Sequence, residues 1–314
     1  MKILRQSLLL AVLAIGGPAA MAQNVSGSIT GIVTDSSGGT VPTARATARN
    51  AGTGATFTAQ ADADGTYWLR NLPVGAYSVS IEASGFQKFE SKDIRLQVNE
   101  VVRIDAKMSV GAVTETVVVQ GNAVTVDTTS STLKAVVDQK RIEELPLNGR
   151  NATQLMRLIV GVTNDPTANV TSGTTYPGTN PVSVNGSRSN ATNYILDGAQ
   201  NNDIYSNAPS PLPNPDALQE FSVQTNNFSA EFGRQSGGIV NAVTRSGTND
   251  VHGQIYEFFR NNELNAKNPL ASDPKDTLRM NQFGAFLGGP IVKDKAFFFA
   301  GYEGQRRGQA ARYS

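Results

Sequence analysis

The chain has 314 residues, with 27 Lys and Arg against 26 Asp and Glu, one His and no Cys. The balanced charge excludes the basic footprint of a nucleic-acid-binding protein, and the absence of Cys excludes disulfides, thiol catalysis and cysteine-ligated metal. The length predicts about two domains. The 30 Gly, with abundant Thr, Val, Ser and Asn, favour β structure with many turns.

Residues 1–22 have the pattern of a secretory signal peptide. Two basic residues precede the apolar run LLLAVLAIGG, and Ala20-Met21-Ala22 has the small-x-small form of a cleavage site. We therefore predict cleavage between Ala22 and Gln23. A membrane anchor is the alternative, but the apolar run is shorter than the ~20 residues of a spanning helix. No later stretch is apolar enough for such a helix, so membrane attachment would use strands.

Residues 23–110 contain short alternating runs separated by turn sequences, at the regular spacing typical of a β-sandwich. Seven runs are predicted to be strands: SITGIVTD, RATARN, ATFTAQ, TYWLR, AYSVSIEASG, KFESKDI and VVRIDAKMSV. In the fifth run, Tyr77, Val79 and Ile81 share one face. Tyr77 is also a candidate tyrosine corner that packs one sheet edge onto the other.

The run from GIVTDSSGG through DADGTYWLRNLPVGAYSV resembles the carboxypeptidase regulatory-like domain. The resemblance implies a transthyretin-like β-sandwich, grouped with the carbohydrate-binding-like folds, that is not catalytic. It leaves a glycan-binding role open. Tyr67 and Trp68 are adjacent in a predicted strand and so point to opposite faces, and one of them is expected in the core rather than on a ligand platform.

No catalytic residue, metal site or cofactor is predicted. A zinc peptidase needs several ligands of the His/Glu type and a general base, whereas His252 is the single His and lies far from the sandwich. Asp62 and Asp64 lack the further ligands of a calcium loop, so Asp64-Gly65 is predicted to be a hairpin turn. The chain is therefore not expected to be an enzyme.

Residues 123–248 have a different pattern. DQKRIEELP predicts a short helix, and GRNATQLMRLIVGV predicts a second helix from the spacing of its apolar residues, which are Leu155, Leu158, Ile159 and Val162. A polar loop, TNDPTANVTSGTTYPGTNP, follows. Strands with tight turns are then predicted in PVSVNG, NYILDG and LQEFSVQTNNFSAEFGRQSGGIVNAVTRSGTN.

The segments EELPLNGRNATQLMRLIVGV, VNGSRSNATNYILDG and ALQEFSVQTNNFSAEFGRQSGGIVNAVTRSGTN resemble, in this order, the plug domain of TonB-dependent outer-membrane receptors. The resemblance implies an α+β plug that fills the wide lumen of a transmembrane barrel. Gly233, Gly237 and Gly238 are predicted to allow tight turns and a close approach to the barrel wall. Five charged residues either pair with barrel charges or stay solvated: Arg188, Glu220, Glu231, Arg234 and Arg245.

Residues 249–314 alternate as transmembrane strands do. In QFGAFLGG, Phe283, Ala285 and Leu287 share one face, and in AFFFAGYEGQ the residues Phe298, Ala300 and Tyr302 do so. QIYEFFRN is the predicted first strand and GGPIVKDKA a short periplasmic turn. Because closed barrels need about 8 strands, we expect the start of an incomplete barrel and the N-terminal portion of a longer receptor. The order of sandwich, plug and barrel resembles the Oar-like and SusC-like branches of the receptors, and the segments EFFRNNELNA, RMNQFGAFLGGPI and KDKAFFFAGYEG look most similar to the Oar-like barrel.

Residues 111–122 join the first two units and contain the stretch TETVVVQG. The resemblance implies a TonB box before the plug, in which an extended peptide adds to a partner's sheet. It comprises Thr114, Glu115, Thr116, Val117, Val118 and Val119. The alternative is an ordinary strand of the sandwich or of the plug.

The resemblance implies a transporter in the cell outer membrane, with the sandwich and the TonB box in the periplasm. The expected partners are TonB with its inner-membrane energising complex, outer-membrane lipid and an unidentified ligand such as a glycan or peptide. The loops TSGTTYPGTNP and NNDIYSNAPSPLPNP are predicted to face that ligand. The alternative function is adhesion or carbohydrate binding through the sandwich.

Overall fold

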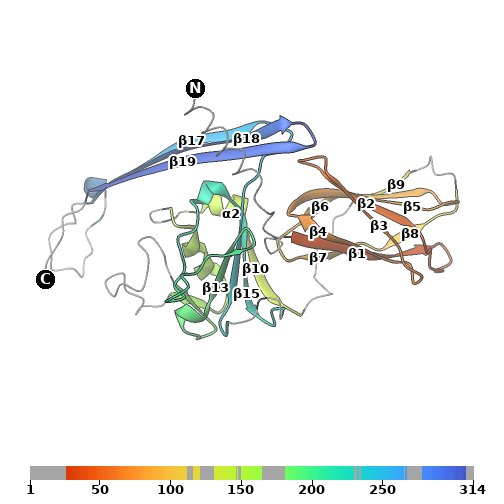
Figure 1. Ribbon diagram of the computed structural model, residues 1–314, viewed down its shortest axis with the longest axis horizontal. Coiled ribbons are helices and arrows are strands. Elements are labelled where there is room, and N and C mark those ends of the chain that lie inside the picture. Colours follow the sequence, from red (N-terminus) through yellow and green to blue (C-terminus); the bar gives the residue numbers. More distant parts are fainter. Residues whose placement is uncertain are drawn as a thin grey trace, which may run out of the picture.

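The computed structural model describes residues 26–111, 116–120, 131–145, 147, 150–164, 181–229, 232, 235–264, 266 and 278–308. The predicted cleavage site, Ala22 and Gln23, lies outside these residues. Three units follow one another along the chain (Figure 1): a sandwich, a middle unit that we call the plug unit, and a three-stranded terminal sheet that lies over the plug unit.

The sandwich consists of two facing sheets, in the orders β4-β1-β7 and β3-β2-β5-β6-β9, with β8 also paired to β1. Its strands are β1 (Ser26–Asp35), β2 (Arg45–Asn50), β3 (Thr56–Gln60), β4 (Thr66–Pro73), β5 (Gly75–Glu82), β6 (Lys88–Leu96), β7 (Val101–Arg103), β8 (Ala106–Met108) and β9 (Thr116–Gln120). The single strand predicted in VVRIDAKMSV is wrong, because it is split into β7 and β8. Between them the Asp105 carboxylate accepts the Ile32 N–H at 2.9 Å, which interrupts the backbone ladder with β1.

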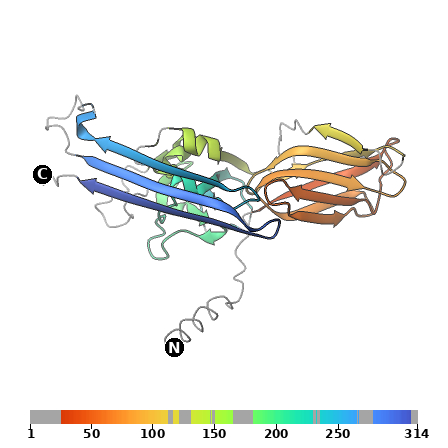
Figure 2. The ribbon, with the colours of Figure 1, turned by 90° about the horizontal axis from the view of Figure 1, so that it is seen from above.

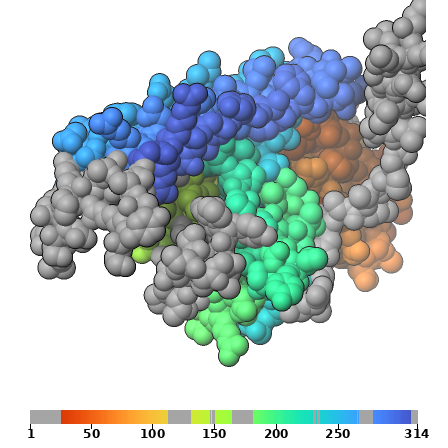
Figure 3. Space-filling model, turned by 60° about the vertical axis from the view of Figure 1, so that its left-hand side comes forward, coloured from red at the N-terminus to blue at the C-terminus, as the bar shows by residue number. Residues whose placement is uncertain are grey.

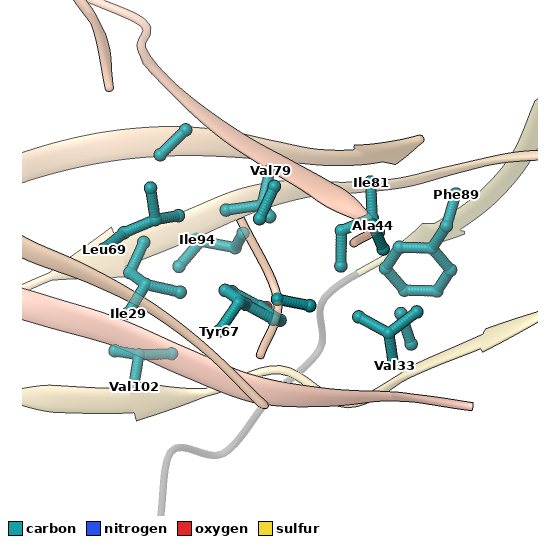
Figure 4. Close-up of a cluster of buried hydrophobic side chains, with 14 of the residues drawn as sticks. Ile29, Val33, Ala44, Tyr67, Leu69, Val79, Ile81, Phe89, Ile94 and Val102 are labelled. Carbon is teal, nitrogen blue, oxygen red and sulfur yellow. The ribbon is translucent and has the colours of Figure 1, made fainter. Parts of the chain in front are cut away.

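The sandwich core forms where the inward residues of the two sheets interdigitate (Figure 4). Val79 and Ile81 are fully buried and Tyr77 is 1% exposed, which confirms the predicted face of β5. Tyr67 is buried in the core whereas Trp68 is 42% exposed, as the opposite facing of neighbouring residues requires.

Two turns of the sandwich test finer predictions. The Tyr77 hydroxyl donates to the Pro73 carbonyl at 2.7 Å, the backbone contact that defines a tyrosine corner. At the second turn, the Asp62 carboxylate accepts the backbone N–H of Asp64, and Gly65 has φ +74. This turn leads from β3 in one sheet to β4 in the other, so the predicted hairpin is wrong: the chain crosses between the layers instead.

The plug unit is built on one mixed sheet in the order β10-β15-β16-β13-β14, with a separate pair β11-β12. Its elements are β10 (Leu133–Asp138), α2 (Gln139–Glu144), η1 (Ala152–Leu158), β11 (Val162–Asn164), β12 (Val182–Val184), η3 (Ser189–Ala191), β13 (Asn193–Leu196), β14 (Ala199–Gln200), η4 (Pro215–Ala217), β15 (Leu218–Asn226) and β16 (Ile239–Thr244). The predicted first helix is confirmed as α2, whose N-cap Asp138 accepts the Arg141 N–H at 3.0 Å.

The second predicted helix is a 3-10 helix instead of an α-helix. It begins after Asn151, whose side chain caps it, and its spacing of three residues buries Ala152 together with Leu155. Leu158, which the α-helical spacing predicted on the buried face, is 66% exposed. Val162 starts β11 after Gly161 turns the chain at φ +82. The predicted α-helical period is therefore wrong for this segment, in which the 3-10 period of three residues applies.

The plug sheet has one apolar and one polar face, and both are buried. Phe221 and Val223 lie in the apolar core of the unit. The alternate residues of β15 form the other face, and Glu220, Ser222 and Gln224 are each at most 3% exposed. Buried polar residues of this kind need partners, and Glu220 finds one outside the plug unit, as described below.

The terminal sheet consists of β17 (His252–Asn261), β18 (Arg279–Val292) and β19 (Ala296–Gly308). Its outer face is apolar and exposed, with Ile255, Leu287 and Tyr302 at 89%, 50% and 67% exposure, while the inner Tyr256 and Phe286 are buried. This confirms the predicted alternation. The predicted turn GGPIVKDKA is wrong in extent, because β18 continues through Val292 and residues 293–295 alone form the turn. No helix within the described ranges is long and apolar enough to cross a membrane.

The two ends of the terminal sheet differ, and the sandwich lies at one of them (Figures 1 and 2). At that end, the side chain of Asn249 donates to the Asp294 carboxylate at 2.8 Å in the short β18–β19 turn. The Asn249 N–H donates to the Gly52 carbonyl of the sandwich at 2.9 Å. At the opposite end, β17 ends at Asn261 and β18 begins at Arg279. The sandwich therefore lies at the end of the terminal sheet that carries the short β18–β19 turn.

Candidate functional site

The plug unit touches the inner face of the terminal sheet through a buried arginine (Figure 3 shows the sheet lying across the plug unit). Arg150 forms an ion pair with Asp216, and the side chains of the two residues are 12% and 3% exposed. Burial lowers the pKa of Arg150, but a guanidinium stays charged at any physiological pH. A buried charge of this kind needs its partner, so the pair fixes the Arg150 segment to η4.

The terminal sheet supplies the other walls around this guanidinium. The Arg150 Cζ lies 4.5 Å from the centroid of the Tyr256 ring and 3.9 Å from that of Phe258. Gln254, on the same face of β17, donates to the Asp216 carboxylate at 3.1 Å. Alternate residues of one strand therefore contact both members of the ion pair. We call Arg150, Asp216, Gln254, Tyr256 and Phe258 the plug–sheet contact.

The contact extends across all three strands of the terminal sheet. Tyr256 on β17, Gly284 on β18 and Glu303 on β19 lie opposite one another in the strand register. The Tyr256 hydroxyl donates to the Glu303 carboxylate at 2.5 Å, over the glycine between them. A Cβ at Gly284 would overlap the Tyr256 hydroxyl, so the small residue makes this hydrogen bond possible.

A second plug arginine lies against the same sheet. Arg245 donates to the Glu143 carboxylate at 3.4 Å within the plug unit, and its Cζ lies 5.7 Å from the Phe299 ring centroid. Arg245 is one of the five charged residues predicted either to pair with barrel charges or to stay solvated, and it contacts an aromatic ring instead. Two of the others, Glu231 and Arg234, lie outside the described residues. Arg150 was not predicted, because a single arginine between two short helices carries no pattern of its own.

A buried carboxylate joins the sandwich to the plug unit. Glu220 on β15 accepts the Val98 N–H from the β6–β7 turn at 2.5 Å. Burial, the largest cause, raises the pKa of Glu220 to about 7; the Val98 hydrogen bond and Arg95 lower the pKa, while Glu100 and Asp138 raise it. The turn is also held by Lys134, which donates to the Asn99 carbonyl at 3.0 Å.

The predicted TonB box lies partly outside the described residues. Thr114 and Glu115 are not described, and residues 116–119 belong to β9, the edge strand of the five-stranded sandwich sheet. β9 runs parallel to β6, from the pair Lys88–Thr116 to the pair Lys92–Gln120. The structure thus gives these valines the position of a last sandwich strand, which was the alternative interpretation; their role in binding stays a prediction.

The predicted plug glycines approach other plug residues closely. A Cβ at Gly237 would lie 2.8 Å from the Ala191 carbonyl oxygen, and a Cβ at Gly238 would lie 2.7 Å from the Val184 side chain. Both glycines thus allow close packing inside the plug unit, whereas the prediction named the barrel wall. Gly233 lies outside the described residues.

One of the two predicted ligand loops is described. In residues 201–215, Asp203 accepts the N–H groups of Tyr205 and Ser206, at 3.1 and 2.7 Å, which fixes a turn. This turn projects Ile204 and Tyr205, which are 98% and 97% exposed. Residues 171–180 of the other loop lie outside the described residues. Within the described part of the chain, no group of three His, Asp or Glu residues is placed to hold a metal ion.

Comparison with known proteins assigns each unit to a domain family. Residues 28–109 match the carboxypeptidase regulatory-like domain, residues 125–240 the TonB-dependent receptor plug domain, and residues 243–314 an outer membrane beta barrel domain. The three families, in this order, define an outer-membrane receptor with a carboxypeptidase regulatory-like domain, a plug and a barrel. The chain belongs to the TonB-dependent receptors.

A curated relative is the TonB-dependent transporter Oar of Myxococcus xanthus, 31% identical over 257 residues, which are 77% of this chain and 23% of that protein. The chain thus spans about a quarter of its relative's length, and the relative confirms the predicted similarity to the Oar-like branch. Two solved structures are also similar. The siderophore receptor PirA of Acinetobacter baumannii is 22% identical, with a TM-score of 0.42 over 56% of this chain and 24% of PirA. The ferric enterobactin receptor PfeA of Pseudomonas aeruginosa is 14% identical, with a TM-score of 0.42 over 57% of this chain and 25% of PfeA.

Proposed function

We propose that this chain is part of a transporter that imports a ligand across the outer membrane, driven by TonB and its inner-membrane energising complex. The observation that carries the proposal is the plug–sheet contact. It seats a plug unit on the inner face of a sheet whose outer face is apolar and suits outer-membrane lipid. Such a seat holds the plug in the lumen until work is done on it.

Coupling requires that the ligand bind two plug states with different affinity. The turn that projects Ile204 and Tyr205 supports a ligand-facing role for residues 201–215, since two large apolar side chains have no intramolecular burial there. The second ligand-facing segment of the proposal is residues 171–181. The ligand is unidentified, with a glycan or a peptide as candidates, and the proposal needs no catalytic residue, cofactor or covalent step.

The proposal includes a processing and domain scheme. A signal peptide, residues 1–22, is removed between Ala22 and Gln23. The sandwich of residues 23–110 and the TonB box in residues 111–122 then lie in the periplasm. The plug comprises residues 123–248, and the barrel begins at residue 249. The polar, charged β18–β19 turn beside the sandwich supports this orientation.

Energy dependence tests the transport function directly. Cells that express the receptor would be given fluorescently labelled oligosaccharides, peptides and ferric siderophores, in the presence and in the absence of TonB. We expect at least one probe to accumulate only with TonB, and its uptake to fall when Ile204 and Tyr205 are both changed to Ser. Surface binding that is unaffected by loss of TonB, with no uptake of any probe, would contradict the proposal.

A second candidate function, glycan binding by the sandwich, is favoured by one observation. Trp68 is 42% exposed on β4, and the Arg70 Cζ lies 5.2 Å from its ring. An exposed tryptophan beside a hydrogen-bond donor is a surface on which a sugar ring can stack. If this function holds, Trp68→Ala should abolish the retention of the chain on a glycan array, and retention that survives this change would contradict it.

A further inference from the structure

The strand Thr116–Gln120 is held at the edge of the sandwich. It forms the last strand in the order β3-β2-β5-β6-β9, and five residue pairs join it in parallel to β6. The segment proposed to bind TonB is therefore already part of a sheet in this chain. Half of its backbone hydrogen-bonding positions face β6, because alternate residues of a parallel strand bond to each side.

A bulge in β6 lies directly after the last described residue pair between β6 and β9. β6 runs from Lys88 to Leu96, and its described pairing with β9 reaches Lys92. The next residue, Asp93, has φ +59 and lies where the register between β5 and β6 shifts. A bulge of this kind twists the strand and ends regular pairing along its outer edge. Within the described residues, β9 is thus paired to β6 from Thr116 to Gln120.

Neither the outer edge of β6 nor the strand β9 is suited to be left without a pairing strand. A bare β6 edge would offer unpaired N–H and C=O groups to other chains, as would a free valine-rich strand. The contact covers one with the other. Departure of β9 therefore exposes two sheet-forming edges at once, which favours its return whenever no other strand is available.

We propose that the β6 edge of the sandwich is an intramolecular holder for the TonB-binding strand, and that TonB must compete with this edge for residues 116–120. The inference rests on the proposed function. While the strand stays in the sandwich sheet, a pull on it loads the sandwich; after it leaves, the pull reaches the plug through residues 121–132 and β10. The holder thus decides when force is transmitted to the plug.

A reversible lock tests the holder. Because the chain has no Cys, the double variant Glu90→Cys/Val118→Cys can form a single disulfide, between Cα partners of the β6–β9 ladder. Affinity for the purified periplasmic domain of TonB would be measured with the whole chain, oxidised and then reduced. We expect at least ten-fold weaker binding in the oxidised form and recovery to within two-fold of the unmodified chain after reduction.

A matched control uses Thr47→Cys/Ser80→Cys, which joins β2 to β5 in the same sheet and leaves β9 free. This variant should bind equally in both redox states. Unchanged binding by the oxidised Glu90–Val118 lock, or failure of that disulfide to form, would overturn the holder. If the unmodified chain and the control bind no TonB at all, the proposed TonB box itself is wrong, so the two failures are distinguishable.

Discussion

The guanidinium carbon of Arg150 lies 3.9 Å from the centroid of the Phe258 ring, so a plug residue is stacked on the first strand of the terminal sheet. The two residues are more than a hundred positions apart in the sequence. Their contact shows how the plug unit is fixed to the sheet: the Arg150 guanidinium pairs with Asp216 and lies against two aromatic rings.

Removal of this arginine should destabilise the plug unit. Arg150→Ala leaves the Asp216 carboxylate, whose side chain is 3% exposed, without its cation. Loss of one member of a buried ion pair costs about 3–5 kcal/mol. The measurement is the free energy of unfolding in urea, and the control is Arg150→Met combined with Asp216→Leu, which removes both charges and should cost less. A single variant that is as stable as the parent would show that the pair is not needed.

The stability of the sandwich–plug contact should depend on pH through Glu220. Because its pKa is raised from 4.5 to about 7 in the folded chain, the folded state favours the protonated form. This contribution is complete below pH 4.5 and is lost as pH rises towards 7. The side chain introduced by Glu220→Gln cannot ionise but keeps an acceptor for the Val98 N–H. The free energy of unfolding of this variant should therefore rise by about 2–3 kcal/mol relative to that of the parent between pH 4.5 and pH 8. Parallel stability profiles of the two proteins over this range would refute the assignment.

A proline in the valine run should prevent strand addition. Val118→Pro removes a backbone N–H and fixes φ, so neither β6 nor a partner's sheet can pair with the strand regularly. We expect binding to the TonB periplasmic domain to weaken at least ten-fold, as measured by biolayer interferometry. Val118→Thr is the control, since it keeps the N–H and the β-branched shape. TonB-dependent uptake that survives the proline variant would rule out a docking role for residues 114–119.

The tyrosine corner should have a measurable effect on the sandwich. Tyr77→Phe removes the hydrogen bond from the Tyr77 hydroxyl to the Pro73 carbonyl, 2.7 Å long, while the ring stays in the core. Loss of such a bond costs about 1 kcal/mol. Tyr205→Phe provides the control, because that side chain is 97% exposed and should be neutral. Equal melting temperatures for the two variants would show that the Tyr77 hydroxyl does not stabilise the sandwich.

The strands and their faces were predictable because they depend on neighbouring residues. The alternation of Tyr77, Val79 and Ile81 determined their burial, and the run DQKRIEELP predicted the short helix α2. The prediction failed where two periods compete: the apolar residues near Leu155 suit both an α-helix and a 3-10 helix. Asn151 caps the 3-10 helix that forms, and Gly161 turns the chain after it.

The sequence by itself determined the three-unit order, the apolar outer face of the terminal sheet and the strand-forming character of residues 116–120. These follow from periodicity and turn residues, which act over a few positions. Only the tertiary structure decided what those elements meet. The pairing of β9 with β6, the Val98–Glu220 hydrogen bond and the stacking of Arg150 on Phe258 each join distant segments, and no local pattern specifies which distant residue fills the space beside a given side chain.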